Sequence, residues 1–327
     1  MNELLTLQQE IITKVAEYSE LKYADSRIRP GIDVIPPSGK VIGTSELQNM
    51  VEASLDGWLT TGRFNAQFEA KLADYLGVKY VLSVNSGSSA NLVAFSALTS
   101  SSLGDRAIKK GDEVITPSNS FIASTASIVH IGATPVFVDV LPNQNIDPSI
   151  IEDAITENTK AIMPVHLTGR VCDMDPILEI AKRHNLIVIE DAAQAIESKY
   201  KKKPSGSIGD IGCFSCYPTK NLGAIGDAGL VTTNNLDLAD KVRMIREYGW
   251  QNRTSIVPGR NSRLDEIQAA ILRIKLKYLD SDNQKRRDTA KFYYENLSLL
   301  PIEFPKISLN VESVFHLFVI NVANQKK

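Results

Sequence analysis

The sequence predicts an α/β fold built on a mostly parallel sheet of seven strands, with helices on both faces. Seven short, nearly continuous apolar runs alternate with helical segments between residues 80 and 234. Such runs are typical of strands that are buried on both faces, and their alternation with helices is typical of βαβ units. A length of 327 residues suits either one large α/β domain or a large domain with a smaller one.

The first 35 residues are expected to form a helical arm. Residues 1–23 alternate apolar and charged side chains at helical spacing, and they lack the basic start and unbroken apolar run of a signal peptide. A proline-bearing link over 27–40 and a helix-like stretch over 45–57 follow. No run reaches the roughly 18 apolar residues of a membrane span. We therefore expect a cytoplasmic protein without a membrane partner.

The large domain is expected over residues 36–263. Its predicted strands cover 80–84, 112–117, 135–140, 161–165, 186–191, 212–217 and 229–234. Ligands of such sheets bind at the carboxyl ends of the strands. Unusual residues follow the strands at those ends: Gly87 and Ser88, Ser118 to Phe121, His166, Asp191 and Gln194, and Lys220.

Residues 264–327 are expected to form a linking helix and a partial small α+β domain. From Leu264 the pattern indicates one long amphipathic helix or a pair of helices. The remainder contains two strand-like pieces, one of them HLFVI at 316–320.

Composition argues for a small-molecule partner. The chain has 36 Lys and Arg against 38 Asp and Glu, a formal charge of -2. This balance lacks the excess of positive charge that is typical of proteins that bind nucleic acid. Its 3 cysteines are too few for a disulfide framework. Cys213 and Cys216 form a C-x-x-C, but they lie in an apolar strand and a fourth thiolate ligand is missing, so we interpret them as core thiols and expect no metal.

Three features at the predicted sheet edge carry chemistry. NSGSSAN (85–91) puts backbone N–H groups and hydroxyls at a helix N-terminus, which suits a phosphate, although a serine-rich helix cap has the same pattern. Asp191 ends an apolar strand and needs a partner such as a protonated ring nitrogen, unless it is an ordinary N-cap. Lys220 follows the next strand and, taken alone, could be a surface lysine. Pyridoxal phosphate requires all three features: a site for its phosphate, a carboxylate beside its ring nitrogen and an amine that forms a Schiff base with its aldehyde.

Six segments in order resemble one family: SGSSAN, PSNSFIASTASIVHIGATPVFVDV, PVHLTGRVCDMDPI, IEDAAQAI, GDIGCFSCYPTKNLGAIGDAG and GRNSRLDEIQAAIL. From about Pro36 to His316 the chain resembles the DegT/DnrJ/EryC1/StrS aminotransferases, fold type I enzymes that use pyridoxal phosphate, mostly on nucleotide-linked keto sugars. The resemblance implies an enzyme that moves an amino group from glutamate to a nucleotide-linked keto-deoxy sugar, for amino-sugar and O-antigen-like polysaccharide biosynthesis.

The resemblance also implies roles for single residues. Lys220 would be the lysine that binds the cofactor, and Asp191 the partner of its pyridine nitrogen. Gln194 would pack near the ring hydroxyl and Phe121 would stack on the ring. The remaining roles are those of phosphate ligands within the chain (Gly87, Ser88, Ser215) and of a residue that reaches the phosphate of the neighbouring subunit in a homodimer (Asn261).

Two alternatives stay open. The N-terminal half looks most like the 3-dehydratase branch of the family, in which a histidine replaces the lysine, whereas Lys220 favours a transaminase. A shortened small domain would also be compatible with a cofactor-binding dimer without turnover. The identity of the nucleotide and the sugar, the carbon that is aminated and its stereochemistry have no readable code in the sequence.

Overall fold

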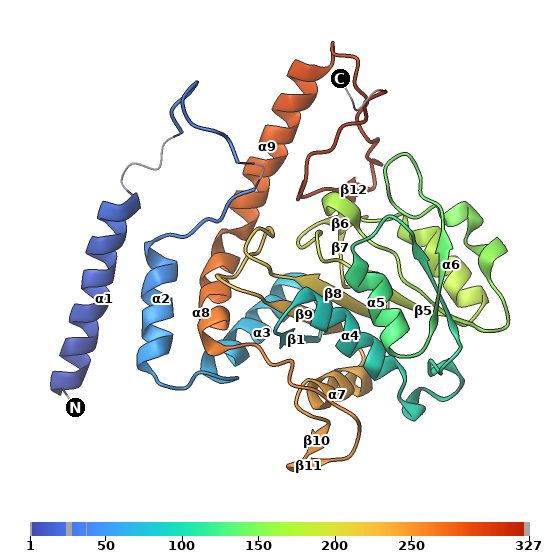
Figure 1. Ribbon diagram of the computed structural model, residues 1–327, viewed down its shortest axis with the longest axis horizontal. Coiled ribbons are helices and arrows are strands. Elements are labelled where there is room, and N and C mark those ends of the chain that lie inside the picture. Colours follow the sequence, from blue (N-terminus) through green and yellow to red (C-terminus); the bar gives the residue numbers. More distant parts are fainter. Residues whose placement is uncertain (1, 24–27, 37, 324–327) are drawn as a thin grey trace.

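The computed structural model describes residues 2–23, 28–36 and 38–323, and it has a central sheet between two layers of helices (Figure 1). The order of the strands in the sheet is β1-β9-β8-β5-β4-β2-β3. β9 is antiparallel to both neighbours and all other pairs are parallel, so the predicted mostly parallel sheet is confirmed. The strands are β1 (Tyr80–Val84), β2 (Glu113–Pro117), β3 (Thr134–Val138), β4 (Thr159–Ile162), β5 (Ile187–Asp191), β8 (Ile211–Ser215) and β9 (Gly229–Thr233).

Helices cover both faces because successive side chains of each strand point in opposite directions. Leu82 of β1 packs in the cluster that contains α4 (Gly87–Leu98) and α7 (Leu236–Ile245), whereas Val81 packs in the cluster of α3 (Arg63–Leu76) and α8 (Glu266–Lys275). At the other end of the sheet, α5 (Ile122–His130) shares the face of α4, and α6 (Met174–Arg183) lies on the face of α3. The carboxyl ends of the parallel strands remain open between these layers.

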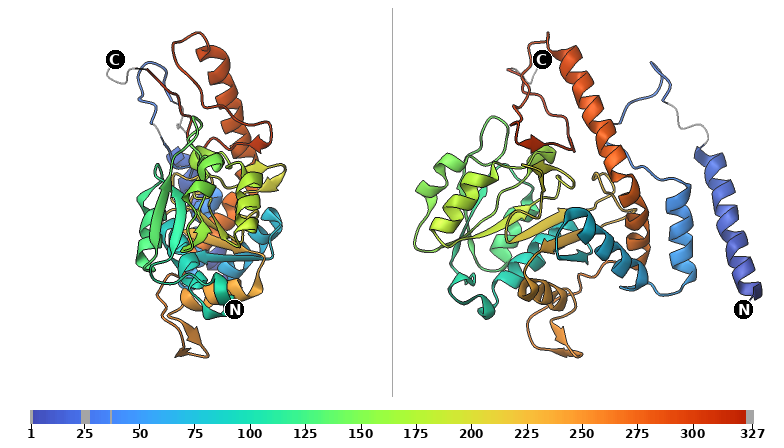
Figure 2. Two further views of the ribbon diagram at one scale, coloured as in Figure 1. Left: turned by 90° about the vertical axis from the view of Figure 1, so that its right-hand side faces the viewer. Right: turned by 180° about the vertical axis from the view of Figure 1, so that it is seen from behind.

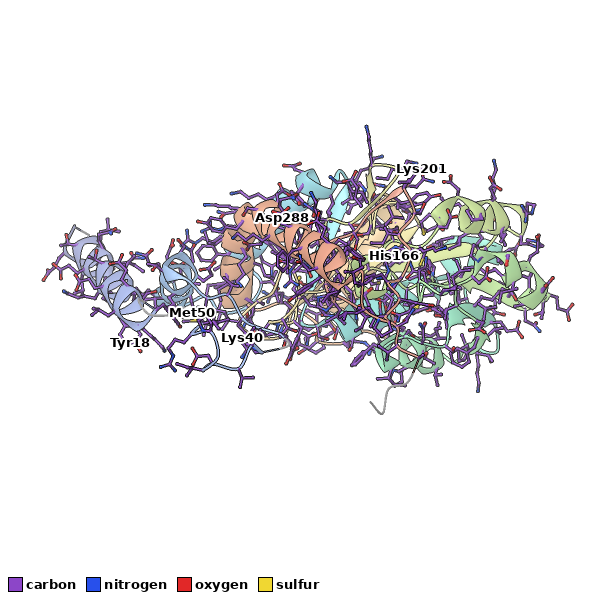
Figure 3. The ribbon with its side chains drawn as sticks, turned by 90° about the horizontal axis from the view of Figure 1, so that it is seen from above. Tyr18, Lys40, Met50, His166, Lys201 and Asp288 are labelled. Carbon is purple, nitrogen blue, oxygen red and sulfur yellow. The ribbon has the colours of Figure 1, made fainter. Side chains whose placement is uncertain are left out.

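The predicted N-terminal helices are confirmed as α1 (Asn2–Tyr23) and α2 (Thr44–Leu55). The side chain of Gln48 in α2 donates to the carbonyl of Ile12 in α1 at 3.2 Å. Figure 3 shows Tyr18 of α1 and Met50 of α2 at one end of the molecule, well away from His166 in the sheet layer. Residues 1, 24–27 and 37 of the predicted arm and link lie outside the described residues.

The predicted linking helix consists of α8, a 3₁₀ turn (Leu276–Tyr278) and α9 (Leu279–Leu297). Figure 2 shows that α9 extends beyond the sheet layer, with the C-terminal segment beside it. The predicted strand over 316–320 is not present, because in the described segment only Glu303 and Asn321 pair as a bridge and a strand needs a continuous neighbour. Instead β12 (Val311–Glu312) joins the hairpin of β6 (Lys199–Tyr200) and β7 (Lys203–Pro204). Residues 324–327 of the predicted small domain lie outside the described part.

The remaining elements are short. A hairpin of β10 (Trp250–Gln251) and β11 (Thr254–Ser255) follows α7. The 3₁₀ helices are Ser101–Arg106, Pro148–Ile150, Glu152–Ala154 and Leu167–Gly169. Of the helices within the described ranges, none is both long and apolar enough to cross a membrane.

Candidate active site

The carboxyl ends of five strands, β1, β2, β4, β5 and β8, open into one cavity of about 430 Å³. Seven of the eight residues singled out from the sequence line it: Gly87, Ser88, Phe121, Asp191, Gln194, Ser215 and Lys220. They come from loops and helices that follow β1, β2, β5 and β8. The parallel topology therefore gathers residues that are up to 133 positions apart (220 − 87) at one edge of the sheet.

The N-terminus of α4 forms one wall of this cavity. Ser86 caps the helix, its Oγ accepting from the backbone N–H of Ser89 at 3.0 Å. At Gly87 a Cβ atom would lie 2.6 Å from the Cβ of Ser215, so only glycine lets the start of α4 approach the end of β8 this closely. The first N–H groups of a helix have no intrahelical acceptor and carry the positive end of its dipole. Their place in the cavity wall fits a phosphate group.

Asp191 is buried at the end of β5, with 4% of its surface exposed. Its Oδ2 accepts from the Ser124 hydroxyl at 2.6 Å and from the Asn91 amide at 3.1 Å, and its Oδ1 accepts from the Ala193 N–H at 3.1 Å. A carboxylate has about four acceptor positions. One position therefore remains, and Asp191 lines the cavity, which fits a protonated ring nitrogen in the site.

Glu190, the neighbour of Asp191, has no acceptor position left. Three backbone N–H groups and one imidazole donate to its carboxylate: Gly206, Ile208, Gly209 and the Nε2 of His166, at 2.7 to 2.9 Å. The Nδ1 of His166 accepts from the N–H of Cys172, so the ring proton is on Nε2. Both side chains are fully buried. Glu190 therefore holds the loop between β7 and β8 in place and is not available to a ligand.

Lys220 lies in the turn after β8, where its backbone N–H donates to the carbonyl of Tyr217 at 2.8 Å. Burial lowers the pKa of its ammonium group, and the nearby Asp191 carboxylate opposes that shift. Among the residues that the structure describes, the Lys220 amine has neither a hydrogen bond nor an ion pair. A primary amine that is easier to deprotonate than usual and has no such partner is suited to attack a carbonyl carbon and to move protons.

A second cavity, of about 960 Å³, adjoins the first at Lys220, which lines both. Its walls come from residues 39–46, from α9 and from residues 315–318. Both signs of charge line it: the basic side chains Lys275, Lys285 and Arg286 in addition to Lys220, and the carboxylates Glu46 and Asp282. This second cavity was not expected from sequence patterns, because the segments that form it lie far apart along the chain.

The other singled-out residues occupy different environments. Gln194 lines the first cavity and its Oε1 accepts from the N–H of Thr168 at 2.6 Å, so its amide NH₂ group remains for a ligand. Phe121 lines the same cavity with 71% of its surface exposed. Asn261 lies outside the cavity and is exposed, with its backbone paired to Glu247.

Asn91 and Ser124, which bind Asp191, were missed from the sequence. Asn91 is four residues after Gly87 in α4, and Ser124 is three residues after Phe121 at the start of α5. Residues at these spacings share one helix face. Helical spacing counted from Gly87 and from Phe121 is therefore a sequence signal that points to both residues.

The interpretation of the cysteines as core thiols is consistent with the structure. Cys172, Cys213 and Cys216 are buried and unbonded to each other. Burial raises the pKa of the Cys216 thiol to about 12 and that of Cys213 well above its usual range. Such thiols are protonated and unreactive at neutral pH.

The model of the DegT/DnrJ/EryC1/StrS aminotransferase family matches residues 41–327. The chain belongs to this family. It is 46% identical over 244 residues to the lipopolysaccharide biosynthesis protein RfbH of Salmonella typhimurium, which covers 74% of this chain and 56% of the relative. It is also 46% identical over 284 residues to dTDP-3-amino-3,6-dideoxy-alpha-D-galactopyranose transaminase of Aneurinibacillus thermoaerophilus, covering 86% of this chain and 76% of that protein. The chain thus spans a little over half of the first relative and about three quarters of the second.

Solved structures of the family have the same fold. DesV of S. venezuelae, solved with a ketimine intermediate, superimposes with a TM-score of 0.81 at 39% identity, over 86% of this chain and 74% of that chain. A sugar aminotransferase of Streptococcus pneumoniae, solved in its PLP form, gives a TM-score of 0.82 at 28% identity, over 88% and 78%. The fold is therefore that of the fold type I sugar aminotransferases.

Proposed function

We propose that this protein is a pyridoxal phosphate-dependent aminotransferase that moves an amino group from glutamate to a nucleotide-linked keto-deoxy sugar. The observation that carries the proposal is the convergence of Lys220, Asp191 and the N-terminus of α4 on one cavity of about 430 Å³. A lysine, a buried carboxylate with one free acceptor position and a phosphate seat are the three protein groups that this cofactor needs. The aminotransferase family membership supports the same reaction.

The residues that would hold the cofactor are those of the first cavity. Its phosphate would bind at Gly87, Ser88 and Ser215, beside the positive end of α4. Gln194 would donate to the ring hydroxyl, and Phe121 would cover one face of the ring. When bound, the cofactor supplies an electron sink that stabilises negative charge on the carbon next to the reacting nitrogen.

Lys220 and Asp191 would have different roles in the reaction. The carboxylate of Asp191 would keep a proton on the ring nitrogen, because Asn91, Ser124 and Ala193 hold it in one orientation. The Lys220 amine would remove a proton from the Cα of glutamate as general base and deliver it, as general acid, to the C4′ of the cofactor. Burial favours the neutral amine that the first of these steps needs. The second half of the reaction would run the same steps in reverse on the keto sugar.

Relatives support the substrate class. They include the dTDP-amino sugar transaminase already described and a GDP-perosamine synthase of Caulobacter vibrioides. Nucleotide sugars of this kind, and glutamate as donor, are the substrates that we propose, for the biosynthesis of a surface polysaccharide such as an O-antigen. We also propose a cytoplasmic location, where nucleotide sugars are made.

Two other functions were open from the sequence. GDP-4-keto-6-deoxymannose-3-dehydratase, solved as a mutant with bound GDP-perosamine, superimposes with a TM-score of 0.84 at 25% identity, so the fold serves both reactions. Lys220 favours the transaminase, because its amine competes for the aldehyde form of the cofactor that a dehydratase must avoid. A cofactor-binding dimer without turnover has no positive observation in its favour.

We propose the division into an arm (1–35), a cofactor domain (36–263) and a small domain (264–327).

A reaction with glutamate distinguishes these functions. Protein loaded with pyridoxal phosphate is expected to release 2-oxoglutarate stoichiometrically, and then to transfer the nitrogen to one member of a panel of dTDP- and GDP-linked keto-deoxy sugars. Mass spectrometry of the sugar product checks the transfer. Loss of a hydroxyl without gain of nitrogen would show a dehydratase, and no 2-oxoglutarate at all would show a non-catalytic protein.

The active unit is proposed to be a homodimer that Asn261 helps to complete. The exposed position of Asn261, outside its own cavity, leaves it free to meet a second copy. Sedimentation is expected to give twice the mass of the chain. Mixing a Lys220→Ala protein with an Asn261→Ala protein is expected to restore part of the activity, because each hybrid dimer has one site with both residues intact. A fully active monomer would contradict the proposal.

A further inference from the structure

A third cavity, of about 280 Å³, lies where the chain after β3, the chain after β4 and the C-terminal segment meet. Its lining residues lie within 141–146, 170–173 and 306–311, together with Tyr200 of β6. None of these described residues lines the first or the second cavity. Ligand pockets of proteins have volumes of roughly 300–1,000 Å³. The third cavity is close to that lower limit, so it has room for a small ligand.

Arg170 is a buried cation in the wall of this cavity, with 3% of its surface exposed. Its Nη2 donates to the carbonyl of Asn143 at 2.8 Å, and its Nε is buried without an acceptor. A guanidinium group has five N–H donors and stays charged in proteins. The other donors of Arg170 have no acceptor among the residues that the structure describes, and burial lowers its pKa. Burying such a charge is costly unless an anion pairs with it.

The backbone next to Arg170 is held firmly by the C-terminal segment. The carbonyl of Gly169 accepts from the hydroxyl of Ser313 at 2.9 Å and from the N–H of Val314 at 3.1 Å. At Gly169, where φ is 92°, a Cβ atom would lie 2.8 Å from the backbone nitrogen of His316, so only glycine is compatible with this approach. Arg170 is therefore fixed at the cavity wall, and its charge has to be balanced there.

Asp173 is the carboxylate in the wall of the third cavity, but it has a different partner. It accepts from the Tyr200 hydroxyl at 2.5 Å. Burial and this contact raise the pKa of Tyr200, so its hydroxyl remains a donor. Within the described ranges, no carboxylate forms an ion pair or a hydrogen bond with Arg170. The guanidinium charge thus has no counterion in that part of the chain.

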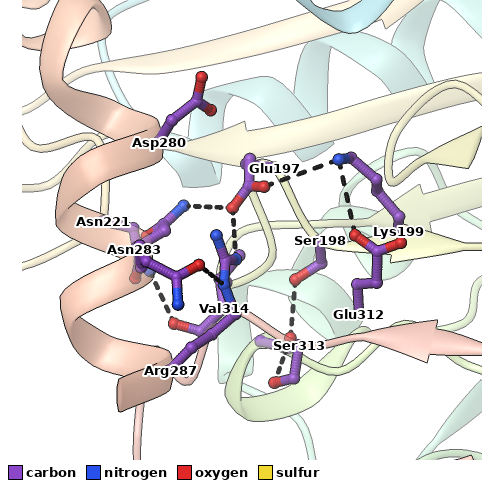
Figure 4. A network of polar contacts seen from close by, with 12 residues as sticks. Glu197, Ser198, Lys199, Asn221, Asp280, Asn283, Arg287, Glu312, Ser313 and Val314 are labelled. Atoms are coloured by element: carbon purple, nitrogen blue, oxygen red, sulfur yellow. Dashed lines mark hydrogen bonds and ion pairs between the residues drawn. The ribbon is translucent and has the colours of Figure 1, made fainter. Parts of the chain in front are cut away.

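The charged residues around the neighbouring strand β12 balance one another (Figure 4). Val311 lines the cavity, so the next side chain of β12, Glu312, points to the opposite face of the strand. Lys199 lies between Glu312 and Glu197, at 3.6 and 3.9 Å, and Glu197 also accepts from Arg287 at 2.9 Å. Two positive and two negative charges neutralise each other in this network, which therefore supplies no counterion to the cavity.

The polar part of the cavity wall fits one negative charge. Arg170 and the exposed Lys306 contribute two positive charges against one negative charge of Asp173. Asn143 also lines the cavity, and its Oδ1 accepts from the N–H of Asn145 at 3.1 Å, so its NH₂ group is left to donate. A group with a single negative charge and oxygen acceptors would balance this wall and accept its hydrogen bonds.

Much of the remaining wall is apolar. Inorganic phosphate has oxygens on all sides, and some of them would lose their hydration against such a wall without gaining a donor. A carboxylate on a short hydrocarbon chain has its oxygens at one end and apolar surface at the other, which matches both parts of the cavity. The apolar residues of the wall are Leu141, Ile146, Val171, Ile307 and Val311.

We propose that the third cavity binds a small aliphatic carboxylate, whose carboxylate group pairs with Arg170 and whose chain lies against the apolar wall. The site is separate from the cavity that holds Lys220 and Asp191, and it does not depend on the proposed reaction. A ligand bound there would connect the chain after β4 to residues 306–311 of the C-terminal segment.

Nitrogen NMR of protein labelled with ¹⁵N-arginine tests the contact in the wild type. Arg170→Lys assigns the Nε–H signal of Arg170 by its loss. Titration of the cofactor-loaded protein with sodium butyrate, at constant ionic strength, is expected to shift this signal until it saturates. The neutral butyramide is expected to leave the signal in place. A signal that butyrate does not move, or that butyramide moves equally, would overturn the proposal.

Thermal unfolding locates the binding by mutation. A ligand that binds only the folded state raises Tm, so butyrate is expected to raise the Tm of the wild type. Arg170→Met is expected to weaken this binding about tenfold or more, because a charged hydrogen bond is lost. Arg286→Met makes the same change in the second cavity and is expected to keep the full response. A response that is lost in Arg286→Met and kept in Arg170→Met would contradict the assignment.

A series of ligands tests the apolar part of the site. From formate through acetate and propionate to butyrate, the affinity is expected to rise about fourfold for each added carbon, the usual effect of burying one more methylene group. Inorganic phosphate is expected to bind more weakly than butyrate. Equal affinities of formate and butyrate, or a preference for phosphate, would show a general oxyanion site and overturn the aliphatic carboxylate.

The site and the proposed function fail in different ways. The titrations need no turnover, and the wild-type NMR titration decides the site even if Arg170→Met does not fold. An inactive protein whose Arg170 signal responds to butyrate would contradict the aminotransferase and support the site. An active aminotransferase whose Arg170 signal does not respond would overturn the site alone.

Discussion

Replacing Lys220 by alanine is expected to lower the rate of 2-oxoglutarate release from glutamate by about 10³-fold or more, because the proton transfers lose their general base and acid. The turn itself is expected to persist, since the hydrogen bond from residue 220 to Tyr217 uses the backbone N–H. Single-turnover kinetics with cofactor-loaded protein measure the effect. Lys14→Ala, which removes an exposed lysine in α1, is the control and is expected to have the wild-type rate.

A chemical label gives a second readout of Lys220. Borohydride reduction of wild type with pyridoxal phosphate, followed by proteolysis and mass spectrometry, is expected to recover the pyridoxyl group on Lys220. Recovery on a different lysine would refute the assignment. Lys220→His is expected to lose both the label and the transamination, and any slow loss of a sugar hydroxyl in that variant would show how close the site lies to a dehydratase.

Replacing Asp191 by asparagine is expected to slow turnover by about 100-fold or more, because a neutral amide cannot keep the ring nitrogen protonated. Cofactor affinity is expected to change little, because the phosphate site that we propose at Gly87 and Ser88 is not altered. Fluorescence titration with pyridoxal phosphate and steady-state kinetics separate the two quantities.

The matched control for this variant is Asp240→Asn, in an exposed i,i+3 ion pair with Arg243. It makes the same chemical change on the surface and is expected to leave turnover and cofactor affinity unchanged. Near-normal turnover of Asp191→Asn would reduce Asp191 to a residue that orders Asn91 and Ser124.

The sheet and most of the cavity wall could be predicted because both depend on local patterns. Each strand is an apolar run, and the unusual residues follow the strands directly, so the topology rule for parallel sheets brings them together. Gly87, Asp191 and Lys220 lie at one edge of the sheet for that reason. The role expected for Gln194, next to the ring hydroxyl of the cofactor, came from the family resemblance, because a single glutamine after a strand does not indicate a function by itself.

The second cavity could not be predicted, because its walls depend on pairings without a local pattern. Asn221, Asn283 and Glu197 are polar residues that look like solvent-exposed positions in the sequence, yet Asn283 is fully buried. Their hydrogen bonds satisfy one another across separations of 62 and 86 residues. The strand expected over 316–320 failed for a related reason, since apolar alternation indicates a strand only where a partner strand exists.

The long-range contacts around His316 also impose an order on how the molecule is assembled. All strands of the seven-stranded sheet precede residue 234, so Asp191 and Lys220 can be placed while the ribosome is still adding the rest of the chain. The seat of His316 needs Gly169 to meet Ser313 and Asn221 to meet Val314, separations of 144 and 93 residues. Residues 313–316 are added after the whole sheet, so a nascent chain would complete the first cavity before the second, and early cofactor capture would find the lysine already in place.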